Sequence, residues 1–166
     1  MNHTTLSALE DFPRRLEAHY EAIPNHFKDW APSSWEGVPS EPLTAIEQVC
    51  HVRDIEIDGY QVRLQRTLSE LHPTLASVDT EGLARERSYR SANAADVLAT
   101  FRAARAETVK LIAGLRPEQF DRIALFEGYG SVSVRSLVHY LCSHDQQHLA
   151  GLQWLLGKIH ALPVTV

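Results

Sequence analysis

The feature of this sequence that most constrains its fold is a set of four long segments in which apolar residues recur every three or four positions. This spacing places apolar side chains along one face of an α-helix, and that face is buried against other helices. Residues 122–134, with Gly128 and Gly130 near their centre, have instead the pattern of a short β-hairpin. The sequence therefore predicts an all-α four-helix bundle with one short hairpin before the last helix.

Prolines, glycines and capping residues set the expected boundaries of the four helices. The connections between them are long, so crossovers are permitted and periodicity does not give the order of the helices in space. The proline-rich and tryptophan-rich stretch before the second helix predicts an ordered loop, and residues 73–91 predict a polar connection. We expect helices over 6–23, with a restart or bend near Pro13, and over 42–71, 94–115 and 134–159.

Length and composition predict a single cytosolic domain spanning residues 1–166. The net charge of −5 is spread along the chain, which argues against a nucleic-acid surface, since phosphates are neutralised by clustered Lys and Arg. No stretch has the length and apolarity of a membrane-spanning helix or a secretory signal. The two cysteines, Cys50 and Cys142, are too few for a disulfide framework, so we expect free thiols.

Two histidines, His144 and His148, lie four positions apart within the last helical segment, in "HDQQH". Side chains at this spacing share one face of a helix and can bind one cation together. The same row carries Leu137 and Leu152, so it faces the bundle, where an unpaired imidazole is costly. The pattern indicates a metal site; the alternative is two hydrogen-bonded or partly exposed histidines.

A third histidine, His51, lies on the apolar side of the second helical segment. Alone it would be read as a packed structural residue, but three inward histidines on two facing helices make an economical metal site. "HDQQH" also resembles the zinc-protease motif H-E-x-x-H, although Asp145 replaces the glutamate and a small bundle lacks the usual cleft-forming sheet. A di-iron centre is excluded, because Glu47 precedes His51 by four positions rather than three.

Over nearly its whole length the chain resembles the DinB-like (YfiT-like) metal-binding four-helix bundles, which are related to the mycothiol-dependent maleylpyruvate isomerases. The likeness rests on the loop from Trp30 to Pro42, on "AIEQVCHVRDIE" with His51, and on "SVSVRSLVHYLCSHDQQHLAGL". It implies a mononuclear divalent site formed by His51, His144 and His148, and a long crossover between the second and third helices. Tyr140 stands where this family often has a further histidine.

Three imidazoles suit several divalent ions, of which we expect zinc or nickel first, with iron or manganese as alternatives. Such an ion lowers the pKa of a bound water or thiol. Asp54 and Asp145 are candidate carboxylates for orienting a ligand or a water, and the alternative is that both are ordinary helix charges. The cysteines lie beside the histidines in sequence but point elsewhere round their helices, so neither is a candidate ligand.

The functional hypothesis is a metal-dependent thiol S-transferase or isomerase acting on a small molecule with a low-molecular-weight thiol, as the resemblance suggests. The alternatives are a metal-dependent hydrolase and a metal-binding or stress-related protein without turnover. A pocket lined by Trp30, Trp35 and a basic residue such as Arg53 or Arg63 would favour an enzyme. Bundles of this size often pair through an exposed apolar helix face, so a homodimer is also expected.

Overall fold

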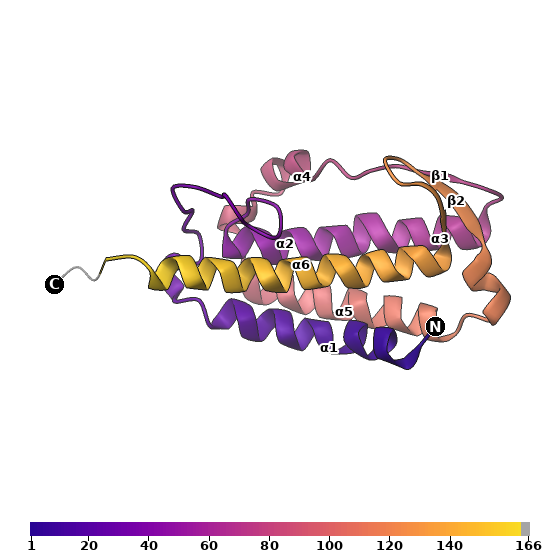
Figure 1. Ribbon diagram of the computed structural model, residues 1–166, viewed down its shortest axis with the longest axis horizontal. Helices are drawn as coiled ribbons and strands as arrows, with labels where there is room; N and C mark the ends of the chain where they lie inside the picture. Colours follow the sequence, from indigo (N-terminus) through magenta and orange to yellow (C-terminus); the bar gives the residue numbers. More distant parts are fainter. Residues whose placement is uncertain (164–166) are drawn as a thin grey trace.

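Four long helical rods lie side by side in the computed structural model, which describes residues 1–163, and this confirms the predicted four-helix bundle with its hairpin (Figure 1). The second rod is built from three consecutive elements, and the other rods are single helices. The rods are α1 (His3–Glu21), then α2 (Ala45–Asp54), η2 (Ile55–Gln61) and α3 (Val62–Ser69) in one line, then α5 (Ala94–Ala113) and α6 (Val134–His160). The smaller elements are the helix α4 (Thr80–Glu86), the short 3-10 helices η1 (Asn25–Phe27), η3 (Tyr89–Ser91) and η4 (Pro117–Asp121), and the strands β1 (Thr74–Leu75), β2 (Ile123–Phe126) and β3 (Gly130–Ser133).

Side-chain caps explain where three of the rods begin. The Thr44 hydroxyl accepts from the Glu47 backbone N–H, and the Glu47 carboxylate accepts from the Thr44 N–H at 2.9 Å. Asn93 caps α5 through its side-chain oxygen, and Ser133 caps α6 in the same way. These caps satisfy backbone donors that have no partner within the helix. The predicted starts of α5 and α6 are therefore confirmed, whereas α2 begins at Ala45, three residues after the predicted start at position 42.

Three local features differ from the expectation. Helix α1 continues through Pro13 without restarting. The second rod contains a π-helix, η2, whose wider turns leave no clear mark in the apolar pattern. The segment predicted as a polar connection, residues 73–91, contains two elements that were not predicted, β1 and the short helix α4. The Asp79 side chain caps α4 by accepting from the Gly82 N–H at 2.9 Å.

The rods do not simply alternate in direction. In Figure 1, α1 and α6 run one way, whereas the α2–α3 rod and α5 both run the other way. The connection 70–93 therefore returns along the outside of the bundle, which is the long crossover that the family resemblance implies. On this path β1 pairs in parallel with β2, which pairs antiparallel with β3. The sheet thus fastens the crossover to the hairpin that precedes α6.

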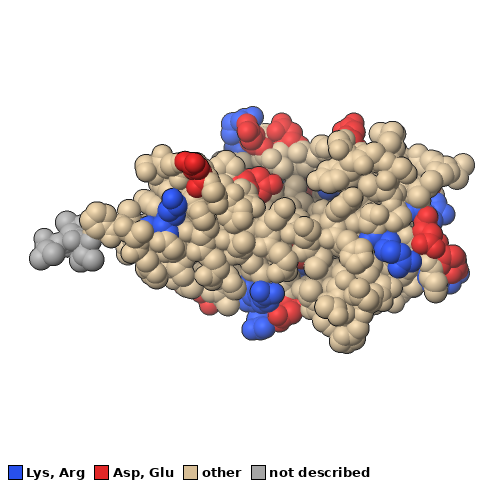
Figure 2. Space-filling view, in the orientation of Figure 1, with Lys and Arg blue, Asp and Glu red and all other residues tan. Residues whose placement is uncertain are grey.

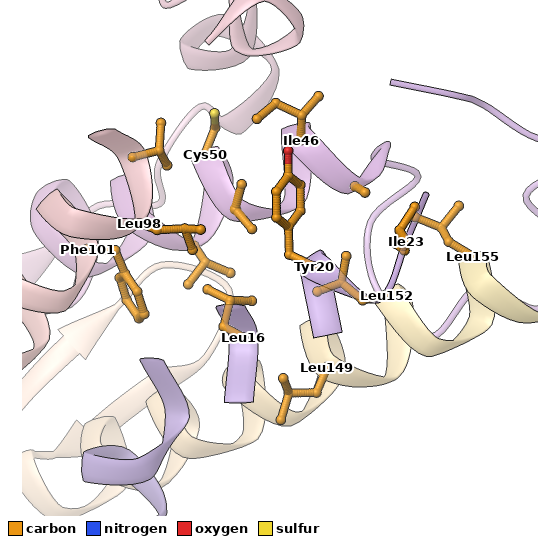
Figure 3. Packing of buried hydrophobic residues seen from close by; sticks show 14 of the residues in the cluster. Leu16, Tyr20, Ile23, Ile46, Cys50, Leu98, Phe101, Leu149, Leu152 and Leu155 are labelled. Atoms are coloured by element: carbon orange, nitrogen blue, oxygen red, sulfur yellow. The ribbon is translucent and has the colours of Figure 1, made fainter. Parts of the chain in front are cut away.

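The core fills the space between the rods. Figure 3 shows side chains from α1, α2, α5 and α6 converging on one apolar cluster. Helix α2 packs against both α5 and α6, so residues on its inner face meet side chains of α6. The labelled members are Leu16, Tyr20, Ile23, Ile46, Cys50, Leu98, Phe101, Leu149, Leu152 and Leu155.

The surface carries its charges in small groups. Figure 2 shows single residues and mixed pairs of Lys or Arg with Asp or Glu on the face in view, with no block of one sign. Among residues 1–163, no helix combines the length and the apolarity that a membrane span needs.

Candidate metal centre

The packing of α2 against α6 brings the three predicted histidines to one point. The Nε2 atom of His144 lies 3.1 Å from Nε2 of His51 and 3.1 Å from Nε2 of His148. His51 and His148 are fully buried, and His144 is partly exposed. Two elements far apart in sequence therefore aim three ring nitrogens at a common centre.

The spacing of these nitrogens fits a shared cation. Ligand nitrogens at about 2.0–2.1 Å from one ion lie about 2.9 Å apart at a right angle and about 3.3–3.4 Å apart at a tetrahedral angle. The two distances of 3.1 Å between His144 and its neighbours fall between these limits. These two pairs of imidazoles thus have the separation that a shared ion requires, and the ligand atoms of all three histidines lie within 4.8 Å of one another.

A carboxylate that sequence reasoning did not single out completes the cluster. Glu41, in the loop before α2, places one oxygen 3.3 Å from Nε2 of His148 and the other 3.9 Å from Nε2 of His51. The Oε2 atom is buried without a hydrogen-bond partner. A buried anionic oxygen facing uncharged imidazoles is costly unless a cation is present. This oxygen is the second observation that fits a metal ion at this point.

The orientation of His148 is set by Gln48 on α2. Nδ1 of His148 lies 2.8 Å from Oε1 of Gln48, an acceptor, so Nδ1 carries the proton and Nε2 is left with its lone pair facing the cluster. Gly151 makes this contact possible, because a Cβ at this position would lie 2.7 Å from Nε2 of Gln48 and 2.3 Å from Oγ of Ser40. The absence of a side chain at 151 therefore lets α2 and its preceding loop approach α6.

All three histidines are held in the neutral form. Burial lowers the pKa of His144 to about 3, and the neighbouring His51, Arg105 and Arg63 act in the same direction. Burial also lowers the pKa of His148 and of His51. A neutral imidazole has a free lone pair on one nitrogen, which is the form that binds a metal.

Asp54, proposed above as an orienting carboxylate, is occupied by other groups. One oxygen accepts from Arg53 at 2.6 Å and lies 2.8 Å from Arg87, and the other accepts from the Tyr89 hydroxyl at 2.5 Å. Burial raises the pKa of Asp54, but the bonds from Arg53 and Tyr89 outweigh it and lower the pKa overall. Among the described residues it forms no hydrogen bond to a histidine of the cluster. Through its contacts with Arg87 and Tyr89, Asp54 holds the crossover against α2.

Asp145 is likewise engaged away from the histidines, although it follows His144 in sequence. Its two oxygens accept from Arg105 of α5 at 2.6 and 2.9 Å, and Arg105 also donates to Glu56 of η2 at 2.9 Å. All three side chains are buried. Burial acts to lower the pKa of Arg105, but the two carboxylates outweigh it and raise the pKa. This buried ion cluster (Arg105, Asp145 and Glu56) links the second rod, α5 and α6.

The two tryptophans of the predicted pocket and the two cysteines pack as structural residues. Trp35 stacks on Trp154 of α6, and Trp30 meets Phe27 edge-on within the loop 24–44. Both tryptophans also pack against the apolar core, so they hold this loop on the bundle. Both cysteines are free, as expected. Cys50 points towards the backbone carbonyl of Tyr89 and away from the histidines, and burial raises its pKa to about 11.

Glu41 and Gln48 are therefore the site residues that the sequence did not reveal. Glu41 stands next to Pro42 in a stretch without periodicity, and its polarity alone is ordinary for a loop. Gln48 lies three residues before His51 on the same helix, and this spacing was the available signal for a polar neighbour of the site.

Comparison with known proteins identifies the family of the chain and a solved structure of the same fold. The sequence matches the family described as the DinB superfamily over residues 8–152. The fold is similar to that of YfiT from Bacillus subtilis, described as a probable metal-dependent hydrolase with an unusual four-helix bundle topology. The identity is 18%, the TM-score is 0.83, and the match covers 96% of this chain and 90% of that one. Comparison with curated proteins gives no match.

Proposed function

Because the chain belongs to the DinB superfamily and gathers three histidines and a glutamate at one point, we propose that it is a divalent-metal-dependent hydrolase of a small molecule. His51, His144 and His148 would hold the ion, with zinc or nickel expected first. An ion bound there acts as a Lewis acid and lowers the pKa of a water or thiol ligand. The description of YfiT as a probable metal-dependent hydrolase agrees with this proposal.

The observation that carries the choice of hydrolysis is the position of Glu41. Attack by water needs a base, and the Oε2 atom of Glu41, which has no hydrogen-bond partner, lies 3.3 Å from Nε2 of His148. In the proposed reaction Glu41 accepts the proton that water loses, and it returns this proton to the leaving group as the substrate bond breaks. A side chain that is 43% exposed can also exchange that proton with solvent.

Thiol transfer is the second candidate, and the surroundings of the cysteines bear on it. Cys50 is buried with a raised pKa, and burial also raises the pKa of Cys142, so neither supplies a thiolate to the site. A thiol nucleophile would therefore come from solution, as the family resemblance suggests. Attack by such a thiol does not require Glu41 as a base, because the ion itself lowers the thiol pKa.

Two reactions measured side by side on metal-loaded protein distinguish hydrolysis from thiol transfer. Hydrolysis of a panel of p-nitrophenyl esters and anilides is measured beside the reaction of glutathione, cysteine, bacillithiol and mycothiol with a haloaromatic electrophile. Glu41→Gln keeps the shape of the side chain but removes the base, and His148→Ala removes a ligand. We expect Glu41→Gln to slow hydrolysis by about 100-fold or more and His148→Ala to abolish it.

The control substitution is Glu36→Gln, a change of the same kind in the same loop, and it leaves hydrolysis unchanged. If the loaded wild type hydrolyses the panel no faster than His148→Ala, the hydrolase proposal is refuted. If thiol transfer alone is accelerated, and Glu41→Gln does not affect it, thiol transferase is the function.

A further inference from the structure

Arg63, near the start of α3, is a buried cation without a counter-ion. The residue is 7% exposed, and no carboxylate lies within 4.0 Å of its guanidinium among residues 1–163. Its Nε atom is buried without a hydrogen-bond partner, and Nη2 reaches the Ala76 carbonyl only at 3.3 Å. Arg105, the other deeply buried arginine of the bundle, is paired with two carboxylates. An unpaired buried guanidinium is costly, so this position requires an explanation.

The surroundings of Arg63 connect it to the metal centre. Its guanidinium carbon lies 5.3 Å from the centre of the Tyr60 ring, and the Tyr60 ring lies 6.2 Å from the ring of His144. Tyr60 therefore stands between the cation and the histidine cluster, and both belong to one site.

Further aromatic rings lead from Arg63 to the surface. Phe126 of the hairpin lies 4.5 Å from the guanidinium carbon and stacks on Tyr129, whose ring is 5.1 Å from that of Tyr140. Tyr129 is 60% exposed and Tyr140 is 37% exposed. The exposed tyrosines mark the side from which a small molecule would reach Arg63.

The backbone of the π-helix makes room for this arrangement. The Arg63 side chain folds back over Gly59, where a Cβ would lie 3.0 Å from Nη1. This distance is tighter than an ordinary contact, so a side chain at position 59 would shift the guanidinium by a few tenths of an ångström. A glycine inside the π-helix η2, a type of element often found at functional sites, thus keeps Arg63 beside Tyr60.

We propose that Arg63 binds an anionic group of the substrate, so that the substrate is a small carboxylate or phosphate ester with an apolar body. A guanidinium binds either anion through paired hydrogen bonds, and its free Nε supplies one of them. The exposed rings of Tyr129 and Tyr140 would pack against the apolar body. This assignment rests on the proposed function, because it places the reacting bond between Arg63 and the metal centre.

The test is calorimetric titration of the full chain with benzoate, phenyl phosphate and neutral benzamide, in chelator-treated and metal-loaded protein. Arg63→Met removes the charge at similar length, and Arg63→Lys retains the charge without the paired donors. Arg135→Met is the matched control, because Arg135 also lies over an aromatic ring, that of Phe120, but is exposed and paired with Asp121. Preference for benzoate or for phenyl phosphate shows which anion the site takes.

We expect chelator-treated wild type and Arg135→Met to bind one of the anions at least about tenfold more tightly than benzamide, and Arg63→Met to lose this preference. If Arg63→Met does not fold, the preference of the wild type and its weakening in Arg63→Lys decide the question. Equal binding by wild type and Arg63→Met, no preference for an anion, or binding that requires metal and ignores Arg63 would each overturn the proposal. Since no turnover is measured, a failed hydrolase assay leaves this result independent.

Discussion

Replacing Arg105 with methionine is expected to destabilise the bundle strongly. The guanidinium makes three charge-assisted hydrogen bonds to Asp145 and Glu56, and the exposed fractions of these side chains are 2% or less. Removing one partner of a buried ion pair costs about 3–5 kcal/mol, because the remaining charges stay buried. In a domain of this size about 1 kcal/mol shifts Tm by roughly 2–4 °C, so we expect a fall of about 6–20 °C.

Arg102→Met is the matched control, three residues earlier on the same helix. Arg102 bonds to Glu17 at 2.8 Å, but its side chain is 57% exposed, so its pair is worth at most about 1 kcal/mol. The assay is urea denaturation of chelator-treated protein followed by circular dichroism, with thermal melts alongside. If the two variants lose the same free energy of unfolding, the buried ion cluster does not stabilise the fold as argued here.

Three further results are expected. Gly151→Ala will weaken metal binding, because the new Cβ displaces Gln48 from His148. The control Gly157→Ala will not, because a Cβ there meets open space, and equal metal affinities of the two variants would contradict this. Chelation will lower Tm, since an ion at about 1,000 times its Kd stabilises the folded state by about 4 kcal/mol. Thermal melts that coincide with and without chelator would contradict a preformed site. In chelator-treated protein the free energy of unfolding will fall as the pH decreases below 6.5. Burial lowers the pKa of His144 in the folded state to about 3, so the unfolded chain binds the proton first. Urea titrations that give the same free energy of unfolding at pH 7 and pH 5 would refute this.

The rods were predictable because long amphipathic helices and their caps leave regular marks in a sequence. Asn93 and Ser133 precede the apolar stripes of α5 and α6, and each starts its helix as expected. Helix α4 was missed because its short polar segment buries no residue and so has no apolar stripe. The π-helix was missed because its extra residue per turn is fixed by packing against neighbouring rods and not by local composition.

The residues of the candidate site also fall into two groups, those that local sequence spacing indicates and those that contacts distant in sequence bring together. The spacing of His144 and His148 on one helix is local, so the sequence alone could place them together, and the second rod supplied His51. Glu41 reaches the centre only because the loop 24–44 folds onto α6, which involves contacts distant in sequence. The partners of Asp54 and Asp145 also lie on other elements, so their ionic roles could not be read from the sequence.

The central claim is that His51, His144 and His148 bind one divalent ion, and elemental analysis of untagged protein tests it most directly. We expect about one ion per chain in the wild type and loss of most of it in His144→Ala, because removing one of three nitrogen ligands greatly weakens the site. His139→Ala, an exposed histidine on the same helix, serves as the control and retains the ion. Equal metal content in wild type and His144→Ala would contradict the account.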